Sequence, residues 1–116
     1  MREALRYVGT PYVEGGSDPS GFDCSGFTRF VFGKAAFALP RDVQDQFKTG
    51  RKLSLGKLRA GDLIFFSTAS RGASHVGIVV DREHFIHAPA SNGAVRVESF
   101  VTPYWRRRVV GARRVG

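Results

Sequence analysis

Cysteine is almost missing from this chain, because Cys24 is the only one among its 116 residues. A lone cysteine rules out an internal disulfide, so the sequence does not reveal the redox compartment. Apolar runs long enough to span a membrane are also missing, and the N-terminus lacks the charged, apolar and small-residue order of a secretion signal. These absences fit either a cytosolic protein or one whose leader has been removed.

Acidic residues are scarce as well: 10 stand against 18 lysines and arginines, for a net charge of +8. Such a chain should be drawn to polyanions such as nucleic acid, anionic lipid or an anionic cell wall. Charge alone, however, fits a solvated basic surface better. The hydrophobic fraction of 42% argues against disorder, and 12.8 kDa suffices for one core. We therefore expect a single domain over residues 1–116.

Helical patterns come first along the chain and strand patterns follow. Apolar residues at three- and four-residue spacing predict short helices at 3–8, 24–32 and 41–49. Apolar or alternating runs predict strands at 63–66, 75–80, 84–88, 95–100 and 109–113, and 53–58 is either irregular or a short strand. This segregation is typical of the α+β class. We expect N-terminal helices packed on a mostly antiparallel sheet of about five strands.

Cys24 follows a turn-rich stretch and precedes a helical pattern. Asp23 is a good N-cap, which places Cys24 in the first helical turn. Free backbone N–H groups and the positive end of the helix dipole stabilise a thiolate at that position. Cys24 is thus a candidate nucleophile. The local residues equally allow a buried free cysteine that acts as a small apolar side chain.

Two histidines are predicted to meet on a hairpin. If the chain turns at Asp81, His75 and His87 lie directly opposite each other, with Cβ atoms roughly 5 Å apart. A turn centred one residue later makes them diagonal neighbours, still within reach, while His84 faces the other side. If the start of the Cys24 helix packs on their face, the cysteine attacks a carbonyl, His75 moves the proton and His87 fixes the tautomer of His75.

Other interpretations of these three residues remain open at this point. Cys24, His75 and His87 could be zinc ligands with one open position, although no second cysteine or carboxylate partner is evident. The histidines could also be ordinary members of a sheet. A metal motif made of His84 and His87 is weaker still, because the two side chains point to opposite faces of a strand.

Several motifs, taken in order, resemble the NlpC-type peptidoglycan endopeptidases, the papain-like cysteine peptidases of the bacterial cell wall. The set covers nearly the whole chain, which makes it far more specific than Asp-Cys-Ser-Gly alone. The motifs are Gly9-Thr10-Pro11-Tyr12, Gly15-Gly16, Phe22-Asp23-Cys24-Ser25-Gly26-Phe27, Leu39-Pro40-Arg41, Gly61-Asp62-Leu63-Ile64-Phe65-Phe66, Ser74-His75-Val76-Gly77-Ile78-Val79, Phe85-Ile86-His87-Ala88-Pro89, Tyr104-Trp105 and Val110-Gly111-Ala112-Arg113-Arg114.

The resemblance implies a papain-like α+β fold and a hydrolase that needs no cofactor or metal. By analogy Cys24 is the nucleophile, His75 the base and His87 the third, orienting member of the triad. The family's substrates are amide bonds of peptidoglycan stem peptides, often the bond between D-glutamate and a diamino acid. We therefore expect a thiol protease of the cell envelope, periplasmic or secreted.

Four further positions match residues that surround the substrate in this family. Tyr12 matches a tyrosine whose hydroxyl lies near the oxyanion, where the backbone N–H of Cys24 is a second donor. Asp23 and Ser25 match positions that line the subsite for the acyl part of the stem peptide. Arg41 matches an arginine near the cleft, and a structural salt bridge is an equal alternative for it.

Two departures from the family pattern concern the substrate cleft. Glu14 stands where an aromatic residue often precedes the Gly-Gly pair, and Asp42-Val43 replaces the usual Thr or Ser. Neither position belongs to the triad, but both bear on the shape and charge of the cleft. Asp62, by contrast, reads as a structural residue whose carboxylate accepts turn N–H groups at the start of a strand.

The expected partners follow from the resemblance and from the charge. Peptidoglycan stem peptides are the substrate, and the basic residues 106–108 and 113–114 could dock on an anionic wall or envelope, or simply line solvated strand edges. We expect a monomer with no nucleic-acid partner and no transmembrane segment. Two rival functions are another papain-like reaction such as acyl transfer, and a non-catalytic basic module that binds wall or nucleic acid.

Overall fold

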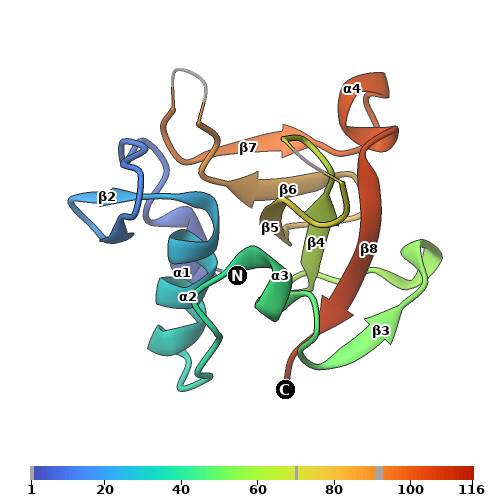
Figure 1. Cartoon of the computed structure of the whole chain (residues 1–116), viewed down its shortest axis with the longest axis horizontal. Coiled ribbons are helices and arrows are strands. Elements are labelled where there is room, and N and C mark those ends of the chain that lie inside the picture. The colour runs from blue at the N-terminus through green and yellow to red at the C-terminus, as the bar shows by residue number, and fades with distance from the viewer. Residues whose placement is uncertain (1, 70, 91–92) are drawn as a thin grey trace.

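The computed structural model describes residues 2–69, 71–90 and 93–116, and it has helices packed against an antiparallel sheet (Figure 1). The helices are α1 (Arg2–Leu5), α2 (Cys24–Lys34), α3 (Val43–Gln46) and α4 (Pro103–Arg106), with a 3₁₀ turn at Leu55–Lys57. A small hairpin pairs β1 (Ser17–Asp18) with β2 (Gly21–Phe22). The six-stranded sheet has the order β3 (Arg51–Leu53), β8 (Val109–Arg114), β4 (Leu63–Phe66), β5 (His75–Val79), β6 (His84–His87) and β7 (Arg96–Ser99).

The α+β prediction is confirmed, and its strand count was slightly low. The sixth strand of the sheet is β3, which pairs with β8 through residues such as Lys52 opposite Arg113. β3 ends at Leu53, the first residue of the stretch that the sequence predicts as irregular or a short strand. The β1–β2 hairpin lies in the glycine-rich stretch before Cys24, where turn residues concealed two short strands.

Helix α2 is the longest helix and packs on one face of the sheet. Its residues Phe27 and Val31 are four positions apart and bury their side chains in a core cluster. The sheet contributes Leu63, Phe65 and Val76 to the same cluster. Figure 1 shows α1 and α2 together on this side of the molecule. The buried stripe of α2 therefore fixes where its first residue, Cys24, lies relative to the strands.

The opposite face of the sheet carries a second, more aromatic cluster. Ile64 and Phe66 alternate with the residues of the first cluster along β4, so they point to the other side. Phe85 of β6 and Trp105 of α4 pack with them. No helix within the described ranges is long and apolar enough to cross a membrane.

The hairpin of β5 and β6 turns one residue later than the preferred prediction. Ile78 pairs with Ile86 and Val79 with Phe85, which centres the turn at Arg82. The cause lies in Asp81, whose Oδ1 accepts the backbone N–H groups of Glu83 and His84 at 2.9 Å each. The prediction of directly opposed histidines is therefore wrong, and the alternative of diagonal neighbours is correct.

Candidate active site

Asp23 caps helix α2 and ties three segments together, as the sequence predicted for the cap. Its Oδ1 accepts the backbone N–H of Gly26 at 2.7 Å. Its Oδ2 accepts the backbone N–H of Gly15 at 3.1 Å and a guanidinium N–H of Arg41 at 2.7 Å. Cys24 is held in the first turn of the helix as a consequence.

The environment of Cys24 stabilises a thiolate less than the helix position suggested. Burial raises the pKa of the Cys24 thiol, and the charge of Asp23 raises it further. Hydrogen bonds from the backbone N–H groups of Val76, Ser25 and Cys24 itself act in the opposite direction but do not outweigh burial. The predicted stabilisation by helix N–H groups is thus present, and the resting sulfur is nevertheless a neutral thiol.

His75 and His87 form a directly bonded pair. Nε2 of His75 lies 2.7 Å from Nδ1 of His87, and the two rings are nearly perpendicular. Burial lowers the pKa of His75 to about 3, and the neighbouring His87 contributes to that shift. Burial also lowers the pKa of His87 to about 4. Both imidazoles are therefore neutral near pH 7, which is the state that a general base requires.

Both rings lie on the aromatic face of the sheet, whereas Cys24 packs against the other cluster. The ring of Trp105 stacks on His75 with centroids 5.6 Å apart and meets His87 edge-on at 5.1 Å. The buried stripe of helix α2, with Phe27 and Val31, packs on the other face of the sheet. The thiol meets the backbone N–H of Val76, one residue beyond His75. No thiol–imidazole hydrogen bond occurs among the described residues.

A carboxylate that the sequence analysis missed completes the row of side chains. Oε2 of Glu98 lies 2.7 Å from Nε2 of His87 and 2.9 Å from Nε of Arg96. The indole N–H of Trp105 donates to Oε1 of Glu98 at 3.1 Å. A cavity of about 400 Å³ opens beside these side chains and is also lined by His75. The strand at Arg96–Ser99 was predicted, but its alignment against His87 is a tertiary feature.

Tyr12 lies close to Cys24, as its predicted role requires. Its backbone N–H donates to the carbonyl of Gly93 at 2.7 Å, and it bridges to Phe22. Burial raises the pKa of the Tyr12 phenol, and the negative charge of Asp23 and that of Cys24 in its thiolate form raise it further. The phenol therefore keeps its proton and remains a hydrogen-bond donor near the thiol.

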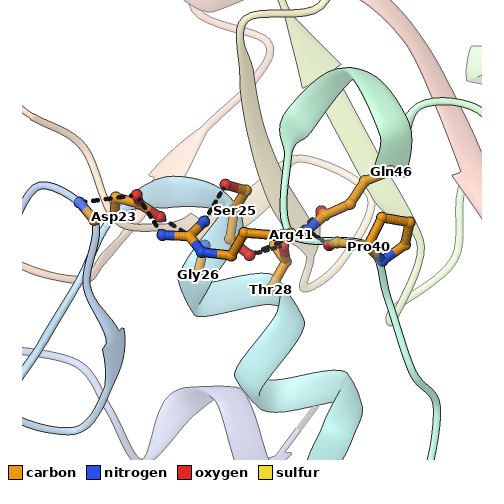
Figure 2. Close-up of polar contacts among 8 residues, drawn as sticks. Asp23, Ser25, Gly26, Thr28, Pro40, Arg41 and Gln46 are labelled. Carbon is orange, nitrogen blue, oxygen red and sulfur yellow. Dashed lines mark hydrogen bonds and ion pairs between the residues drawn. The ribbon is translucent and has the colours of Figure 1, made fainter.

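Arg41 and Ser25 are also brought to the start of α2 (Figure 2). One guanidinium N–H of Arg41 donates to Oγ of Ser25 at 2.8 Å and another donates to Asp23 at 2.7 Å. The ion pair that we set as the alternative for Arg41 is therefore formed. This forked contact leaves Asp23, Ser25 and Arg41 as one connected polar group beside Cys24.

Gln46 of α3 is a buried anchor that the sequence did not single out. Its Nε2 donates to the carbonyls of Ser25 and Pro40 at 3.1 and 2.9 Å, and its Oε1 accepts the hydroxyl of Thr28 at 2.7 Å. Figure 2 shows this amide reaching from α3 to α2 and to the loop that carries Arg41. Gln46 was predicted only as a member of the helix, because its polarity gave no sign of complete burial.

The zinc interpretation of the two histidines does not fit their geometry. Nε2 of His75 and Nδ1 of His87 point at each other, so those two nitrogens are not free to bind one metal ion. His84 lies apart from the pair, with its ring nitrogen 2.9 Å from Asp81. Within the described ranges, no group of three or more His, Cys, Asp or Glu side chains is placed to hold a metal.

Comparison with known proteins decides the family. The model of the NlpC/P60 family matches residues 9–114. The chain belongs to the NlpC/P60 family. The resemblance found in the sequence is thereby confirmed, together with the fold that it implied.

Curated relatives of this NlpC/P60 chain include three bacterial enzymes. The murein DD-endopeptidase MepS/murein LD-carboxypeptidase of Escherichia coli strain K12 is 41% identical over 99% of this chain and 61% of its own length. The gamma-DL-glutamyl hydrolase of Bacillus subtilis is 40% identical over 98% of the chain and 28% of its own length. The bifunctional muramidase/DL-endopeptidase CwlT of the same organism is 38% identical, with shares of 99% and 35%. The chain thus spans only part of each relative.

Solved structures show the same architecture. The NlpC/p60 domain of the peptidoglycan hydrolase SagA superposes with a TM-score of 0.85 and 39% identity, covering 98% of this chain and 94% of that one. A lipoprotein-like NLP/P60 protein of Staphylococcus aureus gives a TM-score of 0.87 and 40% identity, covering 99% of this chain and 39% of that one.

Proposed function

We propose that this chain is a cysteine peptidase that hydrolyses amide bonds in peptidoglycan stem peptides, within a single domain over residues 1–116. The observation that carries the proposal is the bonded pair of neutral histidines, with His75 at the start of β5 and His87 at the end of β6. The thiol of Cys24, in the first turn of α2, bonds the backbone N–H of Val76, the residue after His75. Relatives that match nearly the whole chain are named as murein and DL-endopeptidases, which supports the substrate class.

In the proposed mechanism His75 acts as the base through Nδ1, because its Nε2 is engaged with His87. Sγ of Cys24 attacks the amide carbon while His75 takes the thiol proton, and a C–S bond forms. The oxyanion is stabilised by the backbone N–H of Cys24 and the hydroxyl of Tyr12. His75 then gives the proton to the leaving amine as the C–N bond breaks, and water hydrolyses the thioester.

The proposed mechanism starts from neutral partners rather than from a thiolate–imidazolium pair. The raised pKa of Cys24 and the lowered pKa of His75 both favour the uncharged forms before substrate binds. Proton transfer from the thiol to His75 and attack on the amide carbon are then coupled in one step.

For the substrate we propose a stem-peptide amide, with the bond between D-glutamate and a diamino acid as first candidate. The subsite for the acyl part of the stem peptide is formed by Asp23, Ser25 and Arg41. The guanidinium of Arg41 bonds both other side chains, so a ligand there meets a paired carboxylate and guanidinium. Relatives named for DL, DD and LD bonds are about equally identical to this chain, so sequence identity does not select one bond. The masses of the reaction products identify the bond that is cleaved.

The proposed setting is the cell envelope, periplasmic or secreted, with a monomer that requires no cofactor. The net charge of +8 favours electrostatic contact with an anionic wall or envelope. Nucleic acid is not an expected partner. Hydrolysis at the wall accounts for both the triad and the positive surface.

Mass spectrometry of muropeptides tests the proposal directly. Purified sacculi are incubated with the wild type and with Cys24→Ala, and we expect new fragments from the wild type alone. Fragments from both proteins, with equal yield, would sink the assignment of Cys24. An amine acceptor added in parallel reveals acyl transfer, and binding that needs no Cys24 but weakens with salt reveals a basic binding module.

A further inference from the structure

Glu98 has contacts that an incidental surface carboxylate would not have. Its Oε2 meets Nε2 of His87 at 2.7 Å and Nε of Arg96 at 2.9 Å, and its Oε1 accepts the indole N–H of Trp105 at 3.1 Å. The His87 side chain is completely buried, while Glu98 retains 27% exposure. Both carboxylate oxygens are thus committed to donors around one buried imidazole.

The strand register explains how Glu98 reaches His87. Glu98 pairs with Phe85 and Arg96 pairs with His87, so all four side chains lie on the same face of the sheet. Glu98 and His87 are then diagonal neighbours across the β6–β7 ladder. The position of Glu98 is therefore built into the sheet.

An ionised carboxylate can only accept hydrogen bonds, and this fixes the protons of both rings. His87 must carry its proton on Nε2 in order to donate to Glu98, which leaves Nδ1 as an acceptor. His75 must then donate from Nε2 to that nitrogen, which leaves a lone pair on Nδ1 of His75. Two hydrogen bonds of 2.7 Å thus transmit one choice of tautomer from Glu98 to His75.

Glu98 stays ionised beside these groups. Burial raises its pKa, but hydrogen bonds from Arg96, Trp105 and His87 outweigh burial, so the pKa lies below its usual value. Its negative charge in turn acts to raise the pKa of both His87 and His75, against the larger effect of burial. Glu98 therefore also supports the basicity of the ring that takes the proton.

We propose that Glu98 is a positioning residue that sets, through His87, which ring nitrogen of His75 is free to act as the base. The order of side chains is then Cys24, His75, His87 and Glu98. His87 orients His75, and Glu98 orients His87. The role of Glu98 in catalysis rests on the proposed peptidase function. The tautomers of His75 and His87 are independent of that function.

The first test is a measurement on the unmodified protein. Nitrogen-15 NMR of the histidine rings separates the two neutral tautomers, and at pH 7 we expect both His75 and His87 to carry the proton on Nε2. A proton on Nδ1 of His87 would overturn the proposal, and no variant has to fold for that result. If muropeptides are not cleaved at all, the proposed function fails while this result still stands or falls alone.

Glu98→Gln then tests the consequence, since it keeps the shape and removes the charge. In the orientation that keeps the carbonyl of the new amide on the Trp105 indole, the NH₂ group takes the place of Oε2. It then loses the bond from Arg96 and demands an acceptor at Nε2 of His87. The proton of His87 moves to Nδ1, and the proton of His75 moves to the nitrogen that should be the base. We expect kcat to fall by about 10²-fold or more with KM little changed, as for outer residues that orient a catalytic histidine.

Glu83→Gln is the matched control, because Glu83 is exposed on the loop between β5 and β6. It makes the same chemical change at a distance from the pair, and wild-type kcat and ring tautomers are expected. If Glu98→Gln retains wild-type tautomers and kcat, Glu98 has no positioning role. If kcat falls while both tautomers stay unchanged, the residue acts in another way and the inference is equally rejected.

Discussion

At the level of single residues, the site is distinguished by buried groups that are kept neutral. His87 is fully buried and His75 is only 8% exposed. One ring nitrogen of each is hydrogen-bonded to the other ring. Removing water from an imidazole disfavours its charged form, and the pKa values of about 3 and about 4 follow from that. The same burial that prepares a general base makes the fold sensitive to acid.

The free energy of unfolding should therefore fall as the pH is lowered from about 6.5 toward 4. An unfolded histidine has a pKa of about 6.5, so in this window the unfolded chain binds protons that the native chain excludes. Each histidine contributes a slope of about 1.4 kcal/mol per pH unit, and the native state is favoured as the pH rises. Urea unfolding at several pH values measures the slope.

The variant His75→Gln should remove about half of this slope, while Cys24→Ala keeps both histidines and should retain all of it. Comparison of slopes rather than of absolute stabilities corrects for any general cost of a substitution. A slope that is equal in His75→Gln and the wild type would show that His75 is protonated in the folded protein, against the expectation.

Gln46 supports the site by bonding backbone carbonyls, and its removal should lower the free energy of unfolding. Gln46→Ala leaves the carbonyl of Pro40 without the bond from the buried amide, and it leaves the hydroxyl of Thr28 and the carbonyl of Ser25 with only the bond between them at 3.0 Å. We expect a loss of about 3 kcal/mol in the free energy of unfolding. Gln44→Ala, on the exposed side of the same helix, should change it by less than about 0.5 kcal/mol. Similar losses in the two variants would contradict the anchoring role.

At the level of elements, the hairpin of β5 and β6 places the two histidines. The ladder between β5 and β6 ends at the pair Ile78 and Ile86, so neither His75 nor His87 belongs to a β5–β6 ladder pair. Continuing the register puts Gly77 across from His87, and a Cβ at Gly77 would lie 3.1 Å from the Cβ of His87. The glycine leaves the space into which the two rings converge.

Gly77→Ala should therefore impair catalysis more than folding. The added methyl group would come within 2.7 Å of the Phe85 ring and 3.0 Å of the Ile86 carbonyl, so β6 must shift and carry His87 with it. A displacement of about 1 Å at a catalytic group can cost about 10²-fold in rate, whereas overpacking costs about 1–3 kcal/mol. Muropeptide turnover and thermal unfolding of the same sample separate the two effects.

Gly33→Ala is the control for this substitution, because nothing lies within 4 Å of a Cβ at Gly33. Alanine is the better helix former, so α2 should be unchanged or slightly more stable. Full turnover by Gly77→Ala would show that the pair tolerates a shift of the strand.

The elements show which parts of the site the sequence could predict. The capping role of Asp23, the turn role of Asp62 and the pairing of His75 with His87 were predictable, because each depends on local spacing. The turn centre was not, since it depends on how the side chain of Asp81 bonds the backbone. Glu98 was missed because its contact with His87 arises only when β7 is aligned beside β6.

At the level of the whole molecule, some basic side chains are engaged within the protein and others are available to bind an anionic partner. Arg114 forms an ion pair with Asp62, Arg113 bonds the Phe47 carbonyl and covers its ring, and Arg108 lies over Tyr104. These contacts engage much of the arginine-rich surface that was a candidate for docking. A groove of about 1490 Å³ offers other cations, whose side chains form no ion pair among the described residues: Arg51, Lys52, Lys57, Arg59 and Arg82.

Any electrostatic binding of a flexible polyanion should therefore depend more on this groove than on the arginine run. We compare the triple variant of Arg51, Lys52 and Arg59 to Gln with the triple variant of residues 106–108 to Gln, which has the same net charge. Each lost phosphate contact lowers the slope of log affinity against log salt by about 0.7. Titration with a polyphosphate probe should show a slope reduced by about 2 in the groove variant and by less in the other. Equal reductions would mean that the whole surface, rather than the groove, attracts the polymer.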